Sequence, residues 1–179
     1  MITSRHAYEA LTNTINHNLA QNLERLGERC EQRAGLRRFA AMLYHAAIVC
    51  RSVTPLNPER FKPDELPYEQ MRKFAQISYA CGFVEAICES AKVVHATQAD
   101  LGATNWEDED IADITNHLSL CATELHMACR NLSSQPFVEH AELIGHEIDA
   151  CMRKIQWVQR DLDALLAPAH EAQEQDRPT

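Results

Sequence analysis

The chain has 179 residues, enough for one domain whose core needs neither a metal nor disulfides. Its 17 Lys and Arg against 26 Asp and Glu give a net charge of -9, which argues against direct binding to nucleic acid or to anionic membranes and favours a basic or neutral partner. With 45% hydrophobic residues, 5 Gly and 7 Pro, the composition also excludes collagen-like repeats and wholesale disorder.

The N-terminal sequence contains no basic segment followed by an apolar one, so we expect no secretory signal and a cytoplasmic location. The longest apolar run, Phe39 to Cys50, is too short to span a bilayer. Seven cysteines without a CxxC pair predict reduced, packed thiols rather than a disulfide framework.

The first part of the chain predicts two helices, from Ser4 to about Ala34 and from Leu36 to about Ser52. In the first helix, apolar residues recur at steps of three or four: Tyr8, Leu11, Ile15, Leu19, Leu23, Leu26 and Cys30. Gly35 stands at the junction, where it either ends the first helix or lies inside one continuous rod at a cost of about 1 kcal/mol. The sequence leaves both alternatives open.

Three prolines between residues 53 and 66 predict an extended connection, and a new helix is expected from Pro67 to about Gln98. Apolar residues occur on several sides of this helix, with Tyr79 and Phe83 away from the main stripes. This breadth predicts a central helix with neighbours on several faces.

After a break at residues 99–105, an acidic turn is expected to open a fourth helix that runs to about Leu132. Its apolar seam is Ile111, Ile114, Leu118, Cys121, Leu125, Ala128 and Leu132. A turn at residues 133–136 leads to the last helix, with the seam Phe137, Ala141, Ile144, Ile148, Cys151, Ile155, Val158, Leu162 and Leu165.

Short turns between long helices predict an all-α fold, an antiparallel helical bundle of four to five long helices. We expect a single domain over residues 1–167 and a disordered polar tail over 168–179. Narrow seams must pack against one another or against the same seams of a second copy, which allows a homodimer.

No phosphate-binding loop, GxGxxG, GxSxG or HExxH motif is present, and no ExxH pair supports a di-iron site, so we expect a non-enzyme without a cofactor. His117 and Cys121 lie one turn apart and form a weak candidate half-site for zinc, which His95, Cys88 or Cys50 could complete. Since Cys121 also lies on the apolar seam, ordinary core packing is the favoured explanation.

Charge is unevenly distributed: residues 1–52 carry seven basic and four acidic residues, whereas residues 106–179 carry five and fifteen. Four arginines follow one another at four-residue steps: Arg25, Arg29, Arg33 and Arg37. If the helix continues through Gly35, the four arginines lie in one row, or ridge, on the same helix face and repel one another, and a nearby anion would reduce that repulsion. That anion is supplied either internally, for example by Glu147 and Asp161, or by an acidic partner or a nucleic-acid backbone.

At the other end, an acidic cluster of Glu107, Asp108, Glu109, Asp110 and Asp113 either caps a helix or occupies a basic surface that normally holds nucleic acid. Trp157 lies on an outer stripe of the last helix, where either a third helix covers it or it is exposed to a partner.

Taken together, these features predict a non-enzymatic protein–protein interaction module, such as an adaptor, small subunit, chaperone or inhibitor, acting through charged helical faces. The alternatives are an acidic inhibitor of a basic, nucleic-acid-binding partner and a zinc-binding regulator.

Overall fold

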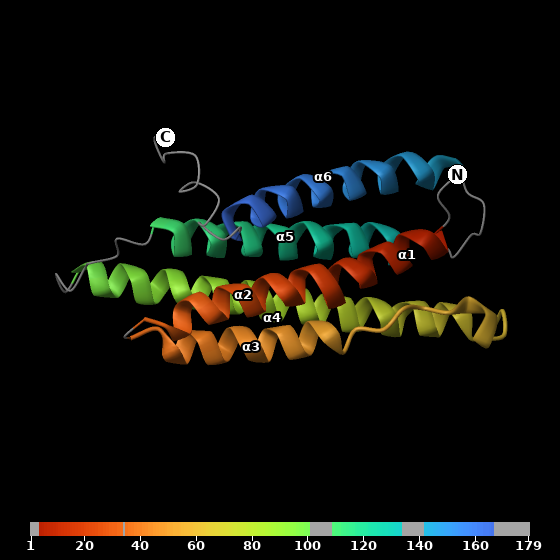
Figure 1. Cartoon of the computed structure of the whole chain (residues 1–179). Coiled ribbons are helices and arrows are strands. Elements are labelled where there is room, and N and C mark those ends of the chain that lie inside the picture. The colour runs from red at the N-terminus through yellow and green to blue at the C-terminus, as the bar shows by residue number, and fades with distance from the viewer. Residues whose placement is uncertain (1–3, 34, 101–108, 134–141, 167–179) are drawn as a thin grey trace, which may run out of the picture.

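A computed structural model describes residues 4–33, 35–100, 109–133 and 142–166, and within these ranges all regular structure is helical (Figure 1). The helices are α1 (Ser4–Asn13), the π-helical η1 (Thr14–Leu19), α2 (Ala20–Glu31), α3 (Arg37–Arg51), the 3-10 helix η2 (Pro58–Arg60), α4 (Leu66–Asp100), α5 (Glu109–Ser133) and α6 (Glu142–Leu166). The predicted all-α fold is confirmed. The predicted turn at 134–136 and the tail at 168–179 lie outside the described residues.

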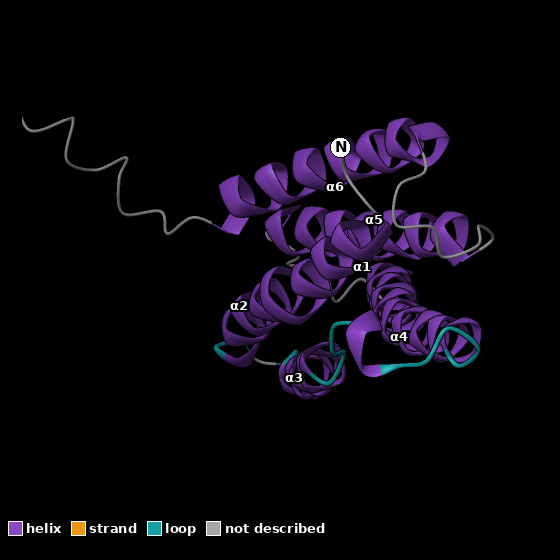
Figure 2. Ribbon diagram, turned by 90° about the vertical axis from the view of Figure 1, so that its right-hand side faces the viewer, coloured by secondary structure: helices purple, strands orange, loops and turns teal. Residues whose placement is uncertain are grey.

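The long helices alternate in direction along one bundle, from the rod formed by α1, η1 and α2 through to α6 (Figure 1). Seen from the side view turned by 90°, α3 and α6 lie at opposite sides and α5 lies between α6 and the others (Figure 2). Helix α5 contacts α1, η1, α2, α4 and α6, so it occupies the central place that the sequence predicted for α4. Helix α4 does have neighbours on more than one side, α3 and α5, but it leaves Tyr79 63% exposed among the described residues, so α5 and not α4 is the central helix.

The predicted apolar seams form the core. All seven seam residues of the first predicted helix are buried, and so are all seven on α5. On α6, Ile155 and Leu162 are buried and Leu165 is half-buried, while Phe137, Ala141 and the side chains of Ile144, Ile148, Cys151 and Val158 lie outside the description. Within the described residues, no helix is both long and apolar enough to cross a membrane.

The N-terminal rod contains a π-helical segment, η1, that the sequence analysis did not predict. Seam residues there are four apart three times in succession: Leu11, Ile15, Leu19 and Leu23. In an α-helix each such step turns the side chain by about 40° beyond the last, so three steps drift by about 120°. The wider π turn, in which the Ala20 N–H reaches the carbonyl of Ile15, absorbs this drift, and all four side chains stay buried.

Gly35 separates the first two predicted helices. Helix α2 ends at Glu31 and α3 begins at Arg37, and Gly35 has φ 91°, in the left-handed region that side chains disfavour. The Leu36 N–H donates to the carbonyl of Arg33 at 3.3 Å, which closes a β-turn with Gly35 at its third position. Of the two alternatives, the continuous rod is therefore wrong; the first helix does end before Gly35, although its C-cap is Gln32 and Gly35 serves the turn that follows.

Replacing two helical glycines by alanine is expected to change the stability of the protein in opposite directions. A Cβ on Gly27 of α2 would stand 2.8 Å from Cε1 of Tyr44 on α3, whereas a Cβ on Gly82 of α4 would meet nothing within 4 Å. We expect Gly27→Ala to destabilise the protein by about 1 kcal/mol or more, because the Tyr44 ring must move. Gly82→Ala should stabilise it by about 1 kcal/mol through helix propensity alone. Urea unfolding of both variants checks this, and the same sign for the two changes would contradict it.

Candidate interaction surface

The four arginines of the predicted ridge do not share one helix face. Arg25 and Arg29 lie on α2, Arg33 lies in the turn that follows, and Arg37 begins α3. Arg25 Nη1 is 3.9 Å from Asp163 Oδ1 on α6, so the acidic last helix supplies one counter-charge internally. The prediction had named Asp161 and Glu147 rather than Asp163. The Oδ1 atom of Asp161 lies 3.8 Å from Nε of Arg160 instead, and the Glu147 side chain lies outside the described residues. Both ends of the Arg25 pair are partly exposed, which limits its contribution to about 1 kcal/mol.

The acidic cluster is only partly within the description. Glu107 and Asp108 lie outside it, and Glu109 and Asp110 provide the first backbone turn of α5, where acidic residues favour a helix start. Asp113 is exposed, and its carbonyl accepts a hydrogen bond from Nδ1 of His117 at 2.8 Å. The structure thus places one described acidic side chain of this group on the surface.

The weak zinc half-site is built around an unsuitable thiol. Cys121 is fully buried, and desolvation raises its pKa to about 12, whereas a zinc ligand must be a thiolate. No three His, Cys, Asp or Glu side chains among the described residues come close enough to hold a metal ion. The side chain of His95, one of the proposed completing ligands, lies outside the description.

Trp157 is 67% exposed on the outer side of α6. Of the two alternatives for this residue, coverage by a third helix is excluded for the described chain and exposure is confirmed. A large exposed aromatic side chain is a common anchor in protein interfaces.

A serine–histidine pair joins α4 to α5. Ser78 Oγ is 2.6 Å from Nε2 of His126, and both residues are partly buried. In the described chain no carboxylate contacts the His126 ring, so the third group that orients a catalytic histidine is missing from what the structure shows. The contact between Ser78 and His126 joins two neighbouring helices through polar groups.

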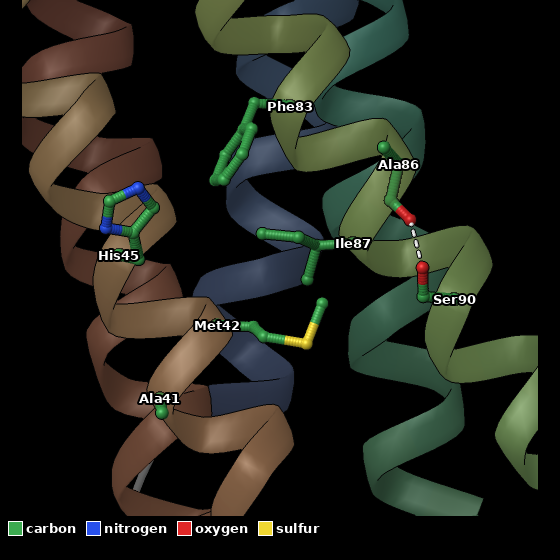
Figure 3. Close-up of a pocket in the computed structure, with 7 residues that line it drawn as sticks. All are labelled: Ala41, Met42, His45, Phe83, Ala86, Ile87 and Ser90. Atoms are coloured by element: carbon green, nitrogen blue, oxygen red, sulfur yellow. Dashed lines mark hydrogen bonds between the residues drawn. The ribbon is translucent and has the colours of Figure 1, made fainter.

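The most distinctive surface feature is an apolar groove between α3 and α4, which we call the α3–α4 groove (Figure 3). It has a volume of about 380 Å³ and is lined by Ala41, Met42, His45, Phe83, Ala86, Ile87 and Ser90. The Ser90 hydroxyl donates to the carbonyl of Ala86 at 2.8 Å, so this polar group is already satisfied inside α4. What the groove offers a partner is chiefly apolar surface.

Aromatic contacts extend this surface along α4. The ring centroids of His45 and Phe83 are 5.4 Å apart in an edge-to-face arrangement. The ring of Tyr79 stacks on that of Phe83, with the two centroids 6.1 Å apart. Figure 3 shows Met42 and Ile87 directed toward each other across the gap between the two helices. Exposed apolar side chains that gather in one place mark binding surfaces more often than scattered ones do.

Sequence reasoning missed the groove, although a signal was present. The run from Phe39 to Cys50 is apolar on nearly every side, and one buried helix face accommodates only part of it: Ala40, Leu43, Ala46, Ala47 and Cys50. Met42 and Ile48 of this run are therefore left exposed, and so is Tyr79 on the neighbouring α4.

Comparison with protein-family models, with curated proteins and with solved structures finds no match to this chain.

Proposed function

We propose that this protein acts without catalysis by binding another protein, as an adaptor, small subunit, chaperone or inhibitor, and that the α3–α4 groove is its docking surface. The observation that carries the proposal is the exposed apolar lining of this groove together with the adjoining Tyr79–Phe83 stack. Apolar surface of this kind gains free energy when a partner covers it.

The shape and charge of the molecule favour one kind of occupant. Two antiparallel helices with apolar side chains directed into the space between them accept the apolar face of a third helix, a common mode of peptide recognition. The net charge of -9 favours a partner whose remaining surface is basic, because opposite charges speed association and suppress wrong partners. The proposed occupant is therefore an amphipathic helix of a basic protein.

Charged substitutions in the groove test this proposal. Ala86 and Met42 line the groove and are exposed, so Ala86→Glu and Met42→Glu leave the core intact. Affinity purification from the native host identifies the partner, and calorimetry then measures its affinity for each variant. We expect each variant to weaken binding at least tenfold, about 1.4 kcal/mol, because a buried carboxylate must lose its water.

Met71→Glu is the matched control, since Met71 is an exposed methionine of α4 that does not line the groove. It should bind like the unmodified protein. Equal affinities for all three variants would overturn the groove as the docking surface. If the affinity falls steeply with salt concentration but is the same for the groove variants and the unmodified protein, the result would support the acidic inhibitor instead.

A further inference from the structure

A second, polar pocket lies where the segment that connects α3 to α4 packs against the start of α4. It has a volume of about 210 Å³ and is formed by the extended segment around η2 and by the first turns of α4. Three basic side chains line it: Arg60 from η2, and Arg72 and Lys73 from α4. This pocket shares no lining residue with the α3–α4 groove and is independent of the proposed function.

Lys73 is the unusual member, because it is only 7% exposed. Its ammonium group donates to the carbonyl of Thr54, to Thr54 Oγ1 at 3.1 Å and to Gln76 Oε1 at 2.7 Å. All three acceptors are neutral, and in the described chain no carboxylate lies within ion-pair distance of Nζ. The hydrogen bonds of Lys73 are satisfied, and the acceptors are a backbone carbonyl, a hydroxyl and an amide rather than a carboxylate.

Burial of an ammonium group is costly when a carboxylate is not in contact with it, and the neighbouring Arg72 adds to that cost. Desolvation lowers the pKa of Lys73 and the neighbouring charge of Arg72 lowers it further, whereas the Glu69 carboxylate acts in the opposite direction. The carboxylate that lines the pocket, Glu69, lies 3.7 Å from Arg72 Nη1 and is already paired there. The pocket therefore gathers three cations around one carboxylate, in a molecule whose net charge is -9.

We infer that this pocket binds a small oxyanion, the phosphate or carboxylate group of a small molecule, against Arg60, Arg72 and Lys73. Arginine guanidinium groups bind both anions through paired N–H groups, and a buried lysine contributes a fixed point charge. Pockets for drug-sized ligands measure about 300–1,000 Å³, so this smaller one fits an oxyanion with a short organic group rather than a whole dinucleotide.

The competing explanation is purely structural: Lys73 ties the extended segment to α4 through Thr54. That role needs donors but no surplus charge, and it does not require Arg60 or Arg72. Variants of these two arginines therefore separate the two explanations without breaking the contact between Lys73 and Thr54.

Calorimetric titration of the full chain at pH 7 with inorganic phosphate, glycerol phosphate and acetate tests the inference. We expect at least one of these probes to bind with a Kd of about 1 mM or tighter. Binding of the two phosphates alone identifies a phosphate site, and binding of acetate alone identifies a carboxylate site. Tighter binding of glycerol phosphate than of inorganic phosphate shows that the organic group is recognised too.

Arg60→Gln and Arg72→Gln should each weaken that binding at least tenfold. Arg38→Gln, which removes one charge from an exposed position on α3 outside the pocket, should leave it unchanged. Lys73→Met should abolish binding; if this variant does not fold, the two arginine variants still decide the question. No binding of any probe, or equal binding to the Arg60, Arg72 and Arg38 variants, would overturn the inference.

Discussion

Above pH 9 this protein is expected to lose stability steeply, by about 1.4 kcal/mol per pH unit for each buried thiol. Six cysteines of the described chain are buried, and desolvation raises the pKa of each above its ordinary value of 9.0. The pKa is raised to about 11 for Cys30, to about 12 for Cys50, Cys88, Cys121 and Cys129, and well above 9.0 for Cys81.

The sign follows from which state holds the protons. Between pH 9 and about 11 the unfolded thiols ionise while the folded ones stay protonated, so the folded state binds more protons and stability falls as the pH rises. Six thiols together lower the free energy of unfolding by up to roughly 8 kcal/mol per pH unit, which is comparable with the whole stability of a small domain. Tyr8, whose pKa burial raises to about 12, adds to the same trend above pH 10.

Urea unfolding followed by circular dichroism at pH 7, 8, 9 and 10 measures this loss. Stability should hardly change below pH 8 and should fall sharply by pH 10. Cys88→Ala removes one titrating group, so its stability should fall less steeply with pH by about 1.4 kcal/mol per unit, whatever it costs at pH 7. Constant stability up to pH 10 would show that the thiols are accessible to water.

A second large effect is expected from two leucines that are two residues apart on α5. Leu118 is fully buried, whereas Leu120 is 47% exposed. Leu118→Ala should destabilise the protein by about 2–5 kcal/mol, because it removes buried methyl groups and leaves a cavity.

Leu120→Ala makes the same chemical change on the surface and should shift stability by no more than about 0.5 kcal/mol. Chemical denaturation of the two variants at pH 7 gives the comparison. A similar loss for both would mean that α5 is covered on its outer face, for example by a second copy of the chain.

The helical seams could be predicted from the sequence because helix geometry is local. A side chain on α5 returns to the same face every three or four residues, so Ile111 to Leu132 could be assigned to the core without knowledge of what they contact. The number and order of the long helices follow from the same periodicity and from the breaks between them, such as Gly35 and the three prolines between residues 53 and 66.

What could not be predicted depends on contacts between segments or on a single backbone angle. The arginine ridge required a helix through Gly35, and one positive φ at that residue removes it. The groove depends on how far α3 and α4 are held apart, and the burial of Lys73 depends on where Thr54 comes to lie. Neither separation is encoded in the periodicity of one helix.

The π-helical segment also affects which changes in chain length the N-terminal rod tolerates. A π turn accommodates one more residue than the α-helical turn it replaces. The segment from Thr14 to Leu19 can therefore lose a residue and wind as an ordinary α-helix, with Tyr8 before it and Leu23 after it still directed into the core. An added or deleted residue elsewhere in α1 or α2 would instead rotate one half of the rod by about 100° against the other.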